Sequence, residues 1–154
     1  MAVTARIGLL EHRGKVRTQA GAFEVERADE GWYAVGGPPE EGAGRVRYDE
    51  DRQVIHIERP GIAVSIDFNP EPSNTTFEFQ GHVYGVGSMD FGEISIKEGS
   101  RAVVRGHLTI SGVRLVSVES ELLPIERELA FGLALRGVAL DEDFWRADHV
   151  RGTW

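Results

Sequence analysis

The chain has 154 residues, of which 41% are hydrophobic and 27% are charged, a globular composition that excludes a disordered tail and a fibrous repeat. Its 25 acidic and 17 basic residues leave a net charge of −8, which disfavours generic binding to nucleic acid. The chain has no cysteine, which excludes disulfides, thiolate catalysis and cysteine zinc sites.

The pattern indicates one domain spanning residues 1–154. A chain of this length buries roughly 70% of its extended surface on folding, which is enough for one core. The longest apolar stretch, Leu129 to Leu140, contains Arg136 and is well short of the ~20 residues that cross a bilayer, so we expect no transmembrane segment. The N-terminus lacks the apolar region of a secretory signal, so we expect a cytoplasmic protein.

From residue 5 to residue 119 hydrophobic residues alternate with polar ones in short runs, a pattern typical of strands. Turn-forming residues separate the runs, as at Arg59-Pro60-Gly61 and Glu98-Gly99-Ser100, and short turns favour antiparallel neighbours. The pattern predicts twelve strands, near 6–10, 15–19, 22–27, 31–35, 45–48, 53–58, 62–68, 75–80, 82–86, 91–97, 102–110 and 113–119.

The last predicted element is a helix over residues 124–140. Pro124 suits a first helical turn, and Glu126 and Glu128 suit a helix N-terminus. The segment 129–140 has no polar stripe, so we expect this helix to be surrounded by protein. The alternative is a pair of strands passing through Gly132 and Gly137. A polar tail, 141–154, follows.

Strands followed by one all-apolar helix predict a mainly β fold: a closed antiparallel barrel of about twelve strands around a buried, hydrophobic C-terminal helix. This order, together with the segment from Phe91 to Trp145, resembles the tubby C-terminal-like superfamily, in particular its LURP-one-related and phospholipid scramblase-like branches. The resemblance implies a twelve-stranded barrel around a central helix, and roles in phosphoinositide binding, lipid handling or regulation. The chain departs from scramblases in lacking a cysteine cluster and in carrying Arg136 within the helix.

Chemical motifs are scarce. Neither a Gly-x-Ser-x-Gly elbow nor a complete dinucleotide loop is present. None of the histidines has the spacing that preassembles two metal ligands (His12, His56, His82, His107 and His149). Asp141, Asp143 and His149 form the best local cluster of ligand types, and we interpret them as solvated. We therefore assign no catalytic residue, no metal site and no cofactor.

Four basic residues form two same-face pairs. Lys15 and Arg17 are two residues apart on one predicted strand, as are Arg45 and Arg47 on another, so each pair projects outward while Val16 and Val46 point inward. Arginine forks bind phosphate in two places, so these four residues are the candidate site for an anionic headgroup. The alternative is that they are solvated charges. A shared site requires the two strands to be neighbours.

These observations predict a non-enzymatic binding or regulatory barrel whose partner is an anionic lipid, in particular a phosphoinositide headgroup, or a protein. One alternative is a small barrel enzyme or carrier for an apolar ligand, which would need a cavity lined by a histidine and a carboxylate. The other alternative is a protein-interaction module.

Overall fold

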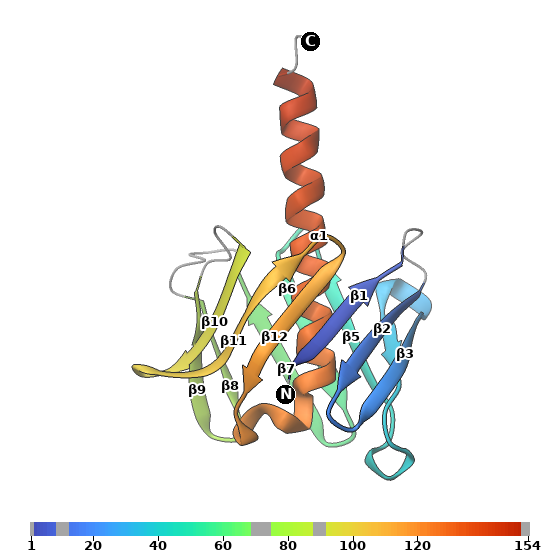
Figure 1. The fold of residues 1–154 in the computed structure, drawn as a ribbon, viewed down its shortest axis with the longest axis vertical. Helices are drawn as coiled ribbons and strands as arrows, with labels where there is room; N and C mark the ends of the chain where they lie inside the picture. The colour runs from blue at the N-terminus through green and yellow to red at the C-terminus, as the bar shows by residue number, and fades with distance from the viewer. Residues whose placement is uncertain (1, 9–12, 69–74, 88–91, 152–154) are drawn as a thin grey trace.

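A computed structural model describes residues 2–8, 13–68, 75–87 and 92–151, with 141–151 described by their backbone alone. Its architecture is mainly β, with one long helix at the C-terminal end of the described chain (Figure 1). The sequence prediction of fold class is confirmed.

The described chain contains twelve strands, close to the predicted ones. The first six are β1 (Val3–Ile7), β2 (Arg13–Thr18), β3 (Gly21–Arg27), β4 (Tyr33–Val35), β5 (Gly44–Asp49) and β6 (Val54–Arg59). The second six are β7 (Ile62–Asp67), β8 (Thr75–Phe79), β9 (His82–Val86), β10 (Glu93–Glu98), β11 (Arg101–Thr109) and β12 (Gly112–Val118). Leu9, Leu10 and Phe91, which were included in predicted strands, lie outside the described residues.

The strands form one antiparallel sheet that curls into a nearly closed barrel. Its order is β7-β6-β5-β4-β3-β2-β1-β12-β11-β10-β9-β8, so all but one of the sheet contacts join neighbours in sequence. The exception is β1, which pairs with β12 and places Val3 opposite Leu115. The end strands β7 and β8 lie close to each other without a described hydrogen-bonded ladder. Gly61 and Gly99 adopt positive φ in two of the tight turns, as their positions predict.

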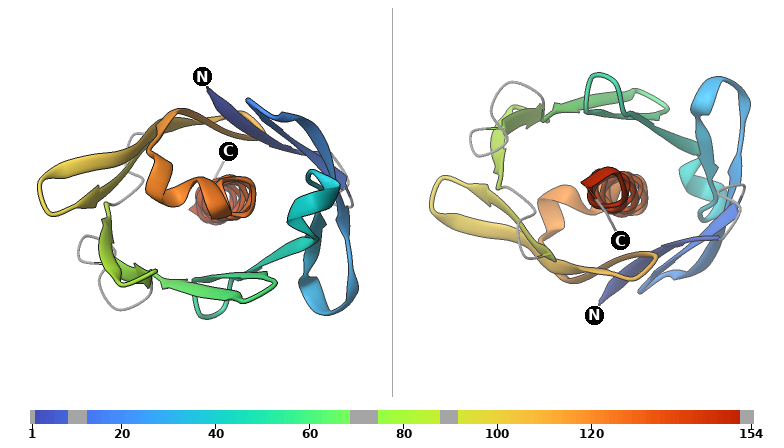
Figure 2. Two further views of the ribbon diagram at one scale, coloured as in Figure 1. Left: turned by 90° about the horizontal axis from the view of Figure 1, so that it is seen from below. Right: turned by 90° about the horizontal axis from the view of Figure 1, so that it is seen from above.

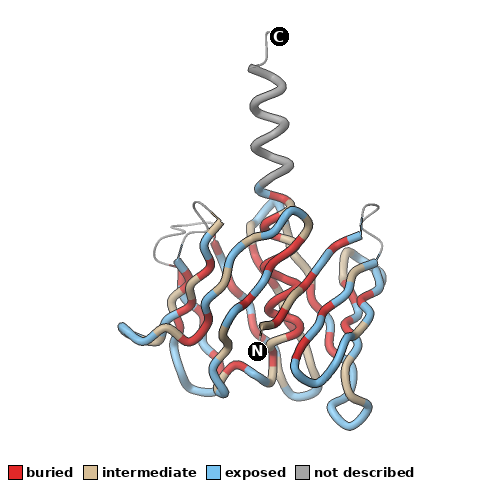
Figure 3. Tube along the Cα trace, viewed as in Figure 1, coloured by how far each residue is buried: buried red, intermediate tan, exposed pale blue. Residues whose placement is uncertain are grey.

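The helix α1 (Glu126–Arg151) runs through the barrel, and the short 3₁₀ helix η5 (Ser120–Ile125) leads into it. Figure 2 shows α1 enclosed by the ring of strands, and Figure 3 shows its first half buried. Leu129, Phe131 and Leu133 are each 0% exposed. The prediction of a buried helix is confirmed, and the alternative of a strand pair through Gly132 and Gly137 is wrong.

The helix differs from its prediction at both ends. Pro124 lies in η5, and the α-helical segment begins at Glu126. The backbone remains helical to Arg151, through most of the predicted polar tail, and projects beyond the barrel (Figure 1). No proline follows Pro124, and no glycine occurs between Gly137 and Gly152, so nothing in this stretch stops the helix. No helix in the described part of the chain is long and apolar enough to cross a membrane.

Helix and wall approach closely at a glycine. A Cβ atom on Gly132 would lie 2.7 Å from Cγ2 of Ile55 on β6 and 3.2 Å from Cγ2 of Val46 on β5. Both wall residues are 0% exposed. Gly132 is therefore required by the narrow gap between α1 and the sheet, a helix-interior position where glycine normally costs stability.

Arg136 is the one arginine in the apolar stretch of the helix, and it is 4% exposed. Its guanidinium lies 3.9 Å from the centre of the Phe68 ring, and its Nη1 donates to the Tyr48 hydroxyl at 2.9 Å and to Gln53 Oε1 at 3.4 Å. Within the described residues an aromatic face and two neutral oxygens surround this guanidinium.

Candidate functional site

The outer surface of the barrel carries the four basic residues that alternation placed there. Val16 and Val46 are 0% exposed and face the core, whereas Lys15, Arg17 and Arg45 are exposed. Arg47 is half-buried. The prediction that both side chains of each pair lie on the outer face of the barrel is therefore confirmed.

The two pairs do not come together. Strands β2 and β5 are separated by β3 and β4, so the pairs lie about 14 Å apart across the sheet at the usual strand spacing. Lys15 pairs instead with Glu24 on β3, its Nζ 3.6 Å from Oε1. The requirement that the two strands be neighbours is not met, and a single small headgroup cannot contact all four cations.

Arg45 and Arg47 meet at Trp32, which directly precedes β4. The guanidinium of Arg45 lies 4.1 Å from the centre of the Trp32 ring, and that of Arg47 lies 5.3 Å from it. Arg45 also donates to both carboxylate oxygens of Glu58 on β6 at 3.0 Å. Both arginines therefore contact the Trp32 indole, and one of them, Arg45, is also bonded to the Glu58 carboxylate.

Arg47 has no ion-pair partner within the described residues, and its Nε is buried without a hydrogen bond. Its cross-strand partner on β6 is His56, whose ring centre lies 6.4 Å from that of Trp32. His56 Nδ1 lies 2.9 Å from the hydroxyl of Ser65 on β7. Partial burial, followed by the charge of Arg47, holds the pKa of His56 below its usual value, which favours the neutral ring.

The site defined by Trp32, Arg45, Arg47, His56 and Ser65 is called the Trp32 site below. It offers one guanidinium without an ion-pair partner in the described part of the chain, a second guanidinium engaged by Glu58, an imidazole and a hydroxyl, from the three neighbouring strands β5, β6 and β7. These groups donate hydrogen bonds and carry positive charge, so they suit an anionic oxygen group such as phosphate.

Sequence analysis identified the arginines of this site and missed the other members. Trp32 and Tyr33 are consecutive and face opposite sides of the wall: Trp32 contacts the outward arginines, whereas Tyr33 is 7% exposed and its ring centre lies 5.2 Å from that of Phe131. Sequence analysis assigned His56 to no site. Its position opposite Arg47 follows only from the register of β5 and β6, which the sequence does not state.

A second charged cluster lies at the end of the barrel where α1 begins, opposite the end from which the helix projects. Glu128 is 0% exposed and lies between Arg59 and Arg127, with Oε1 3.6 Å from Arg59 Nη1 and Oε2 3.9 Å from Arg127 Nε. Arg127 Nη2 also lies 2.6 Å from Oε2 of Glu41. Burial raises the pKa of Glu128, and the two arginines oppose that shift. The side chains of Arg59, Arg127 and Glu128 are buried, that of Glu41 is exposed, and the cluster joins the helix to the wall.

A third cluster lies on the surface around β10. His82 Nδ1 donates to Glu98 at 2.5 Å, Arg101 donates to Glu98 at 3.0 Å, and Arg101 also pairs with Glu121. The hydrogen bond from His82 and that from Arg101 lower the pKa of Glu98. Its charges are mutually satisfied, so it ties β9, β10 and β11 to the start of η5.

No group of three or more potential metal ligands forms among the described residues. His12 and the side chains of Asp141, Asp143 and His149 lie outside the described part of the structure. No family model, curated protein or solved structure matches the chain.

Proposed function

We propose that this barrel is a non-enzymatic binding module that takes a phosphate-bearing lipid headgroup at the Trp32 site. The observation that carries the proposal is Arg47: a half-buried guanidinium beside a second arginine, with no carboxylate partner in the described structure. A phosphate group satisfies such a fork through two parallel hydrogen bonds. The resemblance to the tubby-like superfamily, which implies phosphoinositide binding, supports the same proposal.

The surroundings of Arg47 predict weak, salt-sensitive binding. Glu58 competes for Arg45 through two hydrogen bonds, and the whole chain carries a net charge of −8. Screening over about 8 Å at physiological salt limits the influence of distant acids, so the local pair of arginines still acts on a bound headgroup. The same screening weakens attraction to a negatively charged vesicle as salt rises.

Vesicle sedimentation tests the proposal. Wild-type protein is expected to pellet with phosphoinositide-containing vesicles, less at 500 mM than at 50 mM salt, and to stay in the supernatant with phosphatidylcholine vesicles. The Arg45→Glu/Arg47→Glu variant is expected to lose this binding. The matched control is Lys15→Glu/Arg17→Glu, which changes the net charge equally on the same outer surface and is expected to retain it.

Three outcomes would contradict the proposal. If wild-type protein does not pellet, or if both charge-reversed variants pellet as it does, Arg45 and Arg47 are solvated charges and a protein becomes the favoured partner. Loss of binding in both variants to the same extent would mean that net charge, and not the Trp32 site, governs association.

A further inference from the structure

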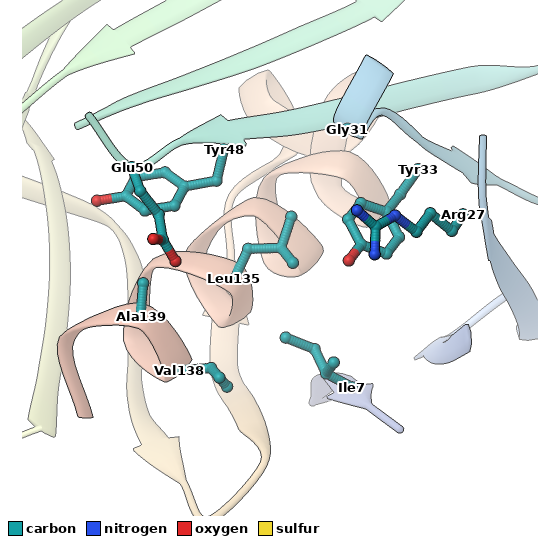
Figure 4. Close-up of a pocket in the computed structure, with 9 residues that line it drawn as sticks. All are labelled: Ile7, Arg27, Gly31, Tyr33, Tyr48, Glu50, Leu135, Val138 and Ala139. Carbon is teal, nitrogen blue, oxygen red and sulfur yellow. The ribbon is translucent and has the colours of Figure 1, made fainter. Parts of the chain in front are cut away.

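A cavity of about 180 Å³ lies between α1 and the barrel wall, near the end from which the helix projects (Figure 4). Its wall comes from β1, β3, β4 and β5, and its floor from the helix. An apolar cavity of about 150 Å³ holds a benzene molecule, so this space accommodates a small ring or a short chain. The cavity faces the interior, whereas the Trp32 site faces outward.

The floor of the cavity is apolar and incompletely covered. Leu135, Val138 and Ala139 line it from the helix, and Ile7 lines it from β1. Leu135 and Val138 are only half-buried, whereas Leu133, two residues before Leu135 on the same helix, is 0% exposed. Apolar surface left open in a pocket of this size favours a compact apolar group as occupant.

Charged groups surround this apolar floor. Arg27, at the end of β3, and Glu50, just after β5, line the cavity, and neither has an ion pair within the described residues (Figure 4). The ring of Tyr48 also lines it, and the hydroxyl of Tyr48 accepts a hydrogen bond from the buried Arg136 at 2.9 Å. Among the described side chains, two guanidinium groups therefore act on the cavity against one carboxylate, and the field of Arg136 is weakly screened because that side chain is buried.

We propose that this cavity binds a small carboxylate with an apolar body about the size of a benzene ring. The body packs on Leu135, Val138 and Ile7, and the carboxylate pairs with Arg27 at the mouth. The excess of positive charge selects an anion over an amine of the same shape. This inference concerns a different site from the proposed headgroup function and does not depend on it.

Amide chemical shifts measured by NMR on the full chain test the inference, with benzoate as the probe. We expect benzoate to shift signals of the cavity residues with a dissociation constant of about 1 mM, the affinity typical of a ligand of this size. Benzyl alcohol and benzylamine, titrated in the same way, are expected to bind at least tenfold more weakly. Each keeps the ring and replaces the carboxylate.

Variants locate the site. Arg27→Gln is expected to weaken benzoate binding about tenfold, because it removes a charge-assisted hydrogen bond. Val138→Phe fills the cavity and is expected to abolish binding; Ala139→Val fills it less and provides the same test if the larger substitution prevents folding. Arg105→Gln, at an exposed arginine on β11, and Leu123→Phe, at an exposed leucine of η5, are the matched controls and are expected to bind like wild type.

The inference is overturned if benzoate shifts no cavity signal or if benzylamine binds as tightly as benzoate. It is also overturned if Arg27→Gln and the folded cavity-filling variant bind like the controls. Loss of vesicle binding by the Arg45→Glu/Arg47→Glu variant leaves this result unaffected, so the two proposals fail separately.

Discussion

The guanidinium of Arg59 and the carboxylate of Glu128 lie 3.6 Å apart, Nη1 to Oε1, inside the end of the barrel where the helix begins. Arg59 is the last residue of β6, and Glu128 belongs to the first turn of α1. Arg59 also donates to the backbone oxygens of Pro124 at 2.5 Å and of Glu41 at 2.8 Å. One side chain thus fastens the entry of the helix, the β4–β5 connection and the barrel wall together.

Removing the Arg59 side-chain charge is expected to lower the free energy of unfolding more than removing the charge of Glu128. Arg59→Met leaves the buried Glu128 carboxylate with fewer compensating charges, and we expect a loss of about 3 kcal/mol in the free energy of unfolding measured with urea. Adding Glu128→Gln to that variant is expected to recover at least about 1 kcal/mol, because a carboxamide needs no counter-charge.

The exposed pair Arg45–Glu58 provides the control for this double-mutant cycle. It also joins a sheet arginine to a glutamate on β6, and both side chains are well exposed. Arg45→Met and Glu58→Gln are each expected to change stability by less than about 1 kcal/mol. Equal effects at the two pairs would show that the Arg59–Glu128 contact does not fasten the helix.

The buried carboxyl group of Glu128 predicts a pH dependence of stability. Burial raises the pKa of Glu128 in the folded protein above its unfolded value of about 4.5, so the folded state holds the proton more tightly. The resulting stability is fully present below that unfolded value and is lost as the pH rises through the folded pKa.

Unfolding curves of wild type and of Glu128→Gln, recorded from pH 4 to pH 8, isolate this effect. Glu126, whose pKa burial also raises, is present in both proteins, so its contribution cancels. We expect the stability of the variant relative to wild type to increase as the pH rises above 4.5. A difference that stays constant, or that moves in favour of wild type, would mean that the two arginines fully compensate the buried charge.

Two helix glycines are expected to respond differently to alanine. Alanine favours a helix over glycine by about 1 kcal/mol, but at Gly132 its methyl group would meet Cγ2 of Ile55 at 2.7 Å, on a β-branched side chain in the core. At Gly137 the methyl would meet Cδ2 of Leu108 at 2.6 Å, the mobile end of a half-buried side chain.

We therefore expect Gly132→Ala to lower the free energy of unfolding by about 1 kcal/mol and Gly137→Ala to leave it unchanged or raise it by up to about 1 kcal/mol. Urea denaturation of both variants measures the contrast. A stabilised Gly132→Ala variant would contradict the close approach of helix and wall at Ile55.

The fold was predictable because its signals are local. Alternation of inward residues such as Val16 and Val46 with outward cations fixes each strand, glycine turns such as Gly61 and Gly99 separate the strands, and the lack of a polar stripe identifies the buried helix. The C-terminal extension of α1 was missed because acidic and aromatic residues after residue 140 were taken as the end of the helix. A helix continues in the absence of a stop signal, whatever the polarity of its residues.

The site was only half predictable because it depends on contacts distant in sequence. The outward direction of Arg45 and Arg47 follows from their spacing in the sequence. Their separation from Lys15 and Arg17 by the strands β3 and β4 does not follow from that spacing. The environment of Arg136 was missed for the same reason. Phe68 and Tyr48, which contact its guanidinium, are distant from it in the sequence, so no local pattern predicts these contacts.

The central claim is that α1 fills the interior of the barrel, and Leu133→Asp tests it most directly. Leu133 is 0% exposed, so the substitution buries an unpaired carboxylate and is expected to cost roughly 3–5 kcal/mol, measured by thermal and urea unfolding. Ile110→Asp, at a fully exposed residue of the β11–β12 turn, is the matched control and is expected to unfold like wild type. A Leu133→Asp protein that melts within a few degrees of wild type would contradict a barrel closed around its helix.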